Sequence, residues 1–118
     1  MGGGLDRINE IRVSPHFLLR EFQCRCCGCV KLSPRLLERL EALREAWGHP
    51  VVVTSGYRCA AHNGKVGGAA RSLHMAGLAA DVAVPQDEQA HVEGIARALG
   101  FVEILPGGRR NYLHLACK

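Results

Sequence analysis

Two histidines and one aspartate are the residues of this chain that point most directly to metal chemistry. His74 ends a glycine-rich segment, Asp81 follows in a run of Ala, Leu and Val, and His114 lies between two leucines. A carboxylate among apolar neighbours must be paired or bound to a metal, because an isolated buried charge is costly. Two histidines and a carboxylate can hold tetrahedral Zn with one position open to water, which is the layout of a catalytic site.

The same three residues also fit a plainer interpretation. His74 would then be a loop residue, His114 a core histidine with its hydrogen bonds satisfied, and Asp81 a cap or turn residue. Spacing alone leaves both interpretations open.

The cysteines are a second group of candidate ligands. The 118 residues hold six Cys and six His, more than a single small core needs for packing. Four of the thiols form two overlapping C-x2-C pairs and cannot easily make one relaxed tetrahedral site. A structural Zn could use one such pair with Cys59 or Cys117, whereas an oxidising compartment would favour disulfides. We treat these two states as equal alternatives, with free thiols third, for Cys24, Cys26, Cys27, Cys29, Cys59 and Cys117.

Composition places these residues in an ordinary small globular domain. With 47% hydrophobic and 22% charged residues, we expect one domain, which would cover residues 14–118. Residues 1–13, which open with three glycines after Met1, are predicted as a flexible leader. No run approaches the roughly 20 apolar residues of a membrane-spanning helix, and no signal peptide precedes the domain, so we expect no membrane insertion. The net charge of +4 suits an anionic polymer such as nucleic acid or cell wall but selects neither.

Helix signals flank the predicted sites. Ser14-Pro15 and Ser33-Pro34 each pair an N-cap residue with a proline suited to the first helical turn, so we predict helices from both. The second would run to a stop at Gly48. A third helix is predicted from Gln86 or Asp87 to Gly100, because apolar residues recur there at helical spacing.

Runs rich in β-branched and other apolar residues predict the strands between these helices: 50–54, 78–84, 101–105 and 112–117. The last two would form a hairpin around the turn signal at 106–110. The glycine-rich segment 56–77 is predicted as a long functional loop. This order of elements predicts an α+β domain, with a small antiparallel or mixed sheet and helices mainly on one face.

One motif in the chain carries a family resemblance. It reads Ser72-x-His74-x-x-Gly77-x-Ala79-Ala80-Asp81, follows Ser55-Gly56-Tyr57-Arg58 and precedes a histidine in a late strand. This arrangement resembles the zinc D-alanyl-D-alanine carboxypeptidases and peptidoglycan L,D-endopeptidases. The resemblance extends from about His16 to the hairpin. It implies the fold shared by these DD-peptidases, bacterial and phage cell-wall hydrolases and the hedgehog signalling domain.

The resemblance implies roles for individual residues. His74, Asp81 and His114 would bind Zn, which can polarise the scissile carbonyl and activate water. Arg58 would hold the substrate carboxylate, because its planar fork makes two parallel charge-assisted hydrogen bonds. Ser72 would lie near the substrate or support His74.

The chain departs from the family pattern at the catalytic base. Relatives commonly have an acidic residue three positions before the last His or a His two before it, and here these positions hold Asn111 and Tyr112. Some relatives also have an Asp two positions after the His, where this chain has Ala116. A turn at 107–110 would place Glu103 opposite His114 on the same face of the sheet. We therefore predict that Glu103 is the general base or a partner that orients His114.

Two further residues are predicted to line the substrate groove. Tyr112 could stabilise an oxyanion, and His62 shares the long loop with His74 and follows Arg58 closely. The resemblance implies a zinc peptidase acting on D-Ala-containing stem peptides of peptidoglycan, as D,D-carboxypeptidase or endopeptidase, and we expect it to be a monomer. It would act at the cell wall, in the periplasm or outside the cell or after phage-type release, without nucleic acid as a partner. The alternative is a non-catalytic zinc domain that binds peptidoglycan or a protein.

Overall fold

The computed structural model describes residues 10–118, and its centre is one antiparallel sheet. The four strands follow the order β3-β4-β6-β5. They are β3 (Val53–Ser55), β4 (Ala79–Ala83), β5 (Glu103–Pro106) and β6 (Tyr112–Ala116). A separate hairpin of β1 (Arg12–Ser14) and β2 (Phe17–Leu18) comes first, and the helices are α2 (Pro34–Trp47), α3 (Ala60–Lys65) and α4 (Gln89–Ala98). Short 3₁₀ helices cover Leu19–Phe22, Leu73–Ala76, Gln86–Glu88 and Gly108–Arg110. The predicted α+β class and C-terminal hairpin are confirmed.

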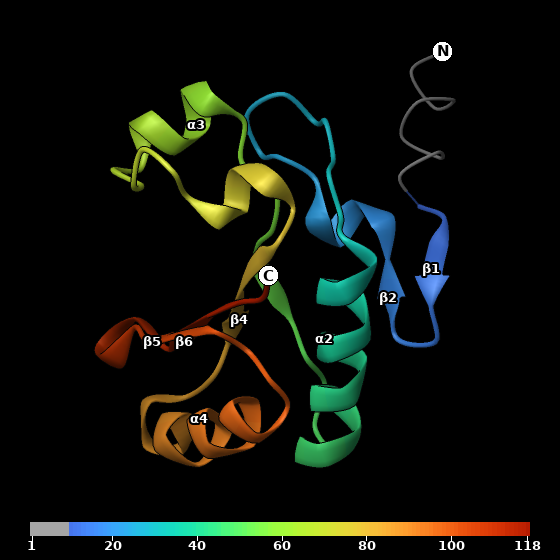
Figure 1. Cartoon of the computed structure of the whole chain (residues 1–118), viewed down its shortest axis with the longest axis vertical. Coiled ribbons are helices and arrows are strands. Elements are labelled where there is room, and N and C mark those ends of the chain that lie inside the picture. Colours follow the sequence, from blue (N-terminus) through green and yellow to red (C-terminus); the bar gives the residue numbers. More distant parts are fainter. Residues whose placement is uncertain (1–9) are drawn as a thin grey trace.

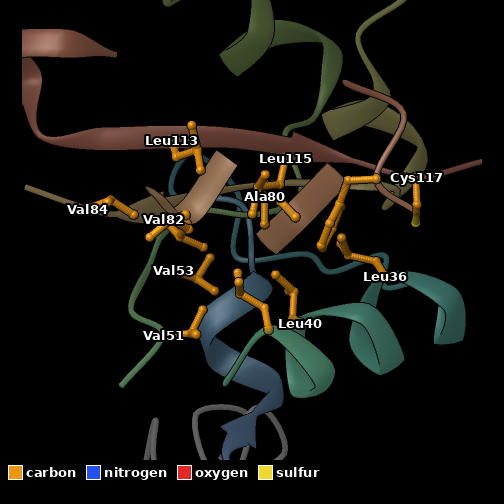
Figure 2. Packing of buried hydrophobic residues seen from close by; sticks show 14 of the residues in the cluster. Leu36, Leu40, Val51, Val53, Ala80, Val82, Val84, Leu113, Leu115 and Cys117 are labelled. Atoms are coloured by element: carbon orange, nitrogen blue, oxygen red, sulfur yellow. The ribbon is translucent and has the colours of Figure 1, made fainter. Parts of the chain in front are cut away.

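One face of the sheet packs on the core. Strand side chains alternate, so β4 and β6 each send every second residue to this face. Helices α2 and α4 cover this face. Figure 1 shows where the two helices lie relative to the sheet, and Figure 2 shows how α2 packs on the strands. The buried residues that meet there include Leu36, Leu40, Leu43, Ala80, Val82, Val92, Leu113 and Leu115. The alternate residues of β4 and β6, Asp81 and His114 among them, are left on the opposite face.

The register of the C-terminal hairpin differs from the prediction. Leu105 lies opposite His114, and Glu103 lies opposite Ala116. The turn is displaced along the chain because the 3₁₀ helix Gly108–Arg110 is followed by Asn111 in the left-handed conformation, with φ 56°. The pairing shifts by an even number of residues, so Glu103 stays on the face of His114.

Of the two predicted Ser-Pro helix starts, one is confirmed and one is wrong. Ser33 caps α2 by accepting a hydrogen bond from the Arg35 backbone N–H at 3.2 Å. Ser14 instead ends β1, and its hydroxyl donates to the Glu41 carboxylate on α2 at 2.5 Å. With its hydroxyl engaged there and the chain reversing at Pro15, the segment forms a hairpin and then a single 3₁₀ turn.

The long segment 56–77 is more ordered than predicted. It contains α3 and the 3₁₀ helix Leu73–Ala76, so it is not a structureless loop. The predicted leader, 1–13, lies mostly outside the described residues, and its last residues Arg12 and Val13 belong to β1. None of the helices in residues 10–118 is long and apolar enough to cross a membrane.

Candidate metal centre

Three ligand atoms meet on the open face of the sheet. His74 Nε2 lies 3.2 Å from Asp81 Oδ1 and 3.2 Å from His114 Nδ1, and His114 Nδ1 lies 3.0 Å from Asp81 Oδ1. Tetrahedral Zn with bonds of about 2.0–2.1 Å separates its nitrogen and oxygen ligands by about 3.3 Å. The triangle is therefore close to the size that one Zn²⁺ ion requires.

Local structure sets the position of each ligand. Asp81 and His114 are paired directly across β4 and β6. His74 lies in the 3₁₀ helix Leu73–Ala76, where the Ser72 hydroxyl accepts a hydrogen bond from its backbone N–H at 3.2 Å. Gly77 ends this helix with φ 72°, and a Cβ there would lie 2.7 Å from the Lys31 backbone. Glycine is therefore required where the chain turns from His74 into β4.

The outer nitrogens of both histidines are also held. His74 Nδ1 lies 2.8 Å from the Gly56 carbonyl oxygen, and His114 Nε2 lies 2.9 Å from Glu103 Oε1. Since these oxygens accept hydrogen bonds, they favour a proton on each outer nitrogen, which leaves the inner nitrogen of a neutral ring available to bind a metal. This is how metal-binding histidines are usually oriented.

The charges of the triad reinforce one another. Burial raises the pKa of Asp81, but hydrogen bonds from His114 and His74 outweigh it and hold that pKa far below its usual range. Burial lowers the pKa of His114, whereas Asp81 and Glu103 raise it, with a net upward shift. Asp81 is therefore ionised at neutral pH, as a metal ligand must be.

A cavity of about 410 Å³ opens over the triad. Arg58 forms part of its wall, and its Nη2 lies 3.2 Å from Asp81 Oδ2 while its Nε donates to the Ser55 hydroxyl at 3.2 Å. The other lining residues are Val66, Gly67, Gly68, Ala69, Arg71, Ser72, Leu73, His74, Asp81, Glu103, Leu105, Tyr112 and His114.

The structure brings most of the predicted site residues together. Arg58, Ser72, Glu103 and Tyr112 all line the cavity with the triad. His62 does not line it. This residue lies within α3, where the sequence analysis predicted a loop.

Two cavity residues were missed by the sequence reasoning. Arg71 immediately precedes Ser72 of the family motif, and Leu105 alternates with Glu103 along β5. These two positions could have indicated that Arg71 and Leu105 line the cavity. That prediction also requires knowing which side of the loop and which face of the strand point to the cavity.

The cysteines separate into two places. All six, which lie within the described residues, are free thiols. The sulfurs of Cys24, Cys27 and Cys59 lie within 4.8 Å of one another. Cys117 instead belongs to the hydrophobic core, as Figure 2 shows. Its place in the chain, two residues after Leu115 and on the same face, puts it in the core. Of the two alternatives, Cys59 and Cys117, it is therefore Cys59 that lies with the N-terminal thiols.

Comparison with known proteins agrees with the geometry of this centre. A family model described as Peptidase M15 matches residues 15–116. The zinc D-Ala-D-Ala carboxypeptidase of Streptomyces albus G is 40% identical over 82 residues, which cover 66% of this chain and 32% of that protein. The chain thus spans about a third of the length of this curated relative.

Proposed function

The chain belongs to the peptidase M15 family, and on that premise we propose that it is a zinc-dependent peptidase of D-Ala-containing peptidoglycan stem peptides. The observation that carries this proposal is the triangle of His74, Asp81 and His114 ligand atoms on the floor of a cavity that also holds Arg58. These three residues would hold the zinc ion. When bound, zinc would supply a Lewis acid that polarises a peptide carbonyl and makes water a nucleophile near neutral pH.

Arg58 supports a preference for a free C-terminal carboxylate. Of the five N–H donors of a guanidinium, two are engaged by Ser55 and Asp81 among the described residues. The rest can make charge-assisted hydrogen bonds to a carboxylate in the cavity. Arg71 lines the same cavity and adds positive charge. Because Arg58 is also beside a zinc ligand, the scissile bond would lie next to the terminal residue, so we propose D,D-carboxypeptidase activity ahead of endopeptidase activity.

The other lining residues have supporting roles in this proposal. The Glu103 carboxylate accepts a hydrogen bond from Nε2–H of His114 and so fixes the direction of its Nδ1. Ser72 holds the backbone of His74. The Tyr112 hydroxyl would stabilise negative charge on the substrate carbonyl oxygen. All of these side chains come from one chain, which supports action as a monomer, and we place that action at the cell wall.

Peptide binding without cleavage is a second candidate function. It is favoured because Asn111 and Tyr112, at the positions where the family resemblance predicts the base, are not ordinary bases, and because Glu103 is engaged with His114. Turnover separates the two functions, because only the first consumes the peptide.

Substrate recognition can be tested with paired peptides. Wild-type protein should release D-Ala from a peptide ending in D-Ala-D-Ala much faster than it cleaves the C-terminally amidated peptide. Arg58→Ala should lose about 100-fold in kcat/KM on the free acid, since two charge-assisted hydrogen bonds contribute about 3 kcal/mol, and should lose the preference. Arg97→Ala, an exposed arginine on α4, is the matched control. An unchanged preference in Arg58→Ala would remove Arg58 from carboxylate binding.

A further inference from the structure

Three cysteines converge at a place that the peptidase centre does not use. Cys24 and Cys27 come from the segment after the 3₁₀ helix Leu19–Phe22, and Cys59 is the N-cap of α3. Their sulfurs are mutually within 4.8 Å. Figure 1 shows the two segments side by side at the upper end of the molecule, and the Cys59 backbone N–H joins them by donating to Cys24 Sγ at 3.4 Å.

Backbone N–H groups donate hydrogen bonds to two of these sulfurs. One of these donors is the Cys59 backbone N–H, which meets Cys24 Sγ. The His62 backbone N–H donates to Cys59 Sγ at 3.4 Å. A backbone N–H aimed at sulfur stabilises a thiolate, the form of cysteine that binds metal.

A tight turn presents Cys24 and Cys27 together. The Gly28 backbone N–H donates to the Cys24 carbonyl at 2.8 Å, and the Cys24 N–H donates to the Cys29 carbonyl at 2.7 Å. Gly28 has φ +74°, a conformation that favours glycine, directly after Cys27. The turn therefore holds Cys24 and Cys27 close together, with both sulfurs within 4.8 Å of the Cys59 sulfur.

We propose that Cys24, Cys27 and Cys59 bind a structural zinc ion, with Cys26 or Cys29 as the fourth ligand. Tetrahedral zinc with Zn–S bonds of about 2.3 Å separates its sulfurs by about 3.8 Å, which small side-chain adjustments within the observed 4.8 Å would reach. Cys26 and Cys29 are exposed free thiols in the same short segment as Cys24 and Cys27, so a side-chain rotation of either could supply the fourth ligand. The thiol protons pass to solvent on binding.

A metal fits the cluster better than a disulfide does. A disulfide would join two of the three sulfurs and leave the third thiol unpaired, whereas one zinc ion uses all of them. The ion would also fasten the segment after Phe22 to α3, and residues just beyond α3, from Val66 to Ala69, form the cavity wall. The thiol site is thus expected to hold that wall in place.

Removing the peptidase centre isolates the thiol site for measurement. His114→Ala, purified with a thiol reductant, should keep one zinc per chain by elemental analysis, against two in the wild type. Its cobalt-substituted form should show sulfur-to-cobalt charge-transfer absorption, which the two histidines and aspartate of the first centre cannot produce. This measurement needs no cysteine substitution, so it does not depend on the folding of a cysteine variant.

Cysteine variants in the same background locate the ligands. Cys59→Ser should weaken zinc binding by more than 100-fold. Loss of a residue that only hydrogen-bonds to a ligand already lowers metal affinity by about 10–100-fold, and loss of the ligand itself should lower it further. The double variant Cys26→Ser/Cys29→Ser should weaken it too. Cys117→Ala, which changes a core cysteine, should keep the zinc. Zinc-free His114→Ala, a cobalt form without sulfur charge transfer, or a Cys24–Cys59 disulfide in the reduced preparation would each overturn the proposal.

Discussion

Glu103 reaches His114 from the adjacent strand although the residue directly opposite His114 is Leu105. A diagonal pair on one face of a sheet is within reach of a side chain as long as glutamate. The carboxylate meets Nε2, the nitrogen that points away from the zinc ligand triangle. Of the two roles predicted for Glu103, this geometry supports orientation of His114.

Substitution of Glu103 separates orientation from proton transfer. Glu103→Ala should lower zinc affinity about 10–100-fold, as loss of an orienting partner does. Glu103→Gln keeps an acceptor for Nε2 and, when saturated with zinc, should retain measurable peptide turnover. Zinc titration and turnover at saturating zinc are the two measurements, with the exposed Glu38→Gln as control. Complete loss of turnover in zinc-saturated Glu103→Gln would instead make Glu103 the general base.

Single residues also show how far the sequence could lead. His74, Asp81 and His114 could be proposed as ligands because each is a polar intruder in an apolar or glycine-rich setting. His62 was assigned to the groove from its nearness in sequence to Arg58, and only the direction of α3 shows that it lies elsewhere.

At the scale of elements, the N-terminal hairpin is tied to α2 through one carboxylate. Glu41 accepts hydrogen bonds from the Ser14 hydroxyl and from the backbone and ring of His16, at 2.5, 2.8 and 2.6 Å. This long-range contact explains why a Ser-Pro pair became a hairpin rather than a helix. A local helix signal contains no information about a partner so distant in sequence.

The Glu41 contact predicts a pH-dependent stability. Burial raises the pKa of Glu41, but the bonds from Ser14 and His16 outweigh it and lower that pKa. The stabilisation is therefore complete above the ordinary glutamate pKa of about 4.3 and is lost as pH falls below it. Glu41→Gln should cost about 1–3 kcal/mol at pH 7 and less at pH 4, by urea unfolding. Equal costs at both pH values, or a similar cost for exposed Glu45→Gln, would contradict this.

The end of β3 is held against the chain at Phe22. A Cβ on Gly56 would lie 2.6 Å from the Phe22 Cα, and the Gly56 carbonyl is the oxygen that holds His74 Nδ1. Gly56→Ala should therefore lower the free energy of unfolding by about 1–3 kcal/mol and weaken zinc binding. Gly94→Ala on α4, with no atom within 4 Å of the new Cβ, should stabilise the fold by about 0.5–1 kcal/mol. Full zinc affinity in Gly56→Ala would contradict the link to His74.

At the scale of the whole molecule, one antiparallel sheet separates two kinds of face. Leu113 and Leu115 of β6 enter the core with α2 and α4, while Tyr112 and His114 of the same strand face the cavity. The strands and this alternation could be read from the sequence. The hairpin register could not, because it depends on the left-handed conformation of Asn111. An even shift nonetheless left Glu103 on the cavity face.

The central claim is that the cavity face is a zinc peptidase site. The most direct test measures D-Ala release from a muramyl pentapeptide ending in D-Ala-D-Ala, together with zinc content, for wild type and His114→Ala. Wild-type protein should release D-Ala, zinc removal by a chelator should stop release and added zinc restore it, and His114→Ala should release none. Zinc-loaded wild type that binds the peptide without releasing D-Ala, or His114→Ala with unchanged release, would contradict the claim.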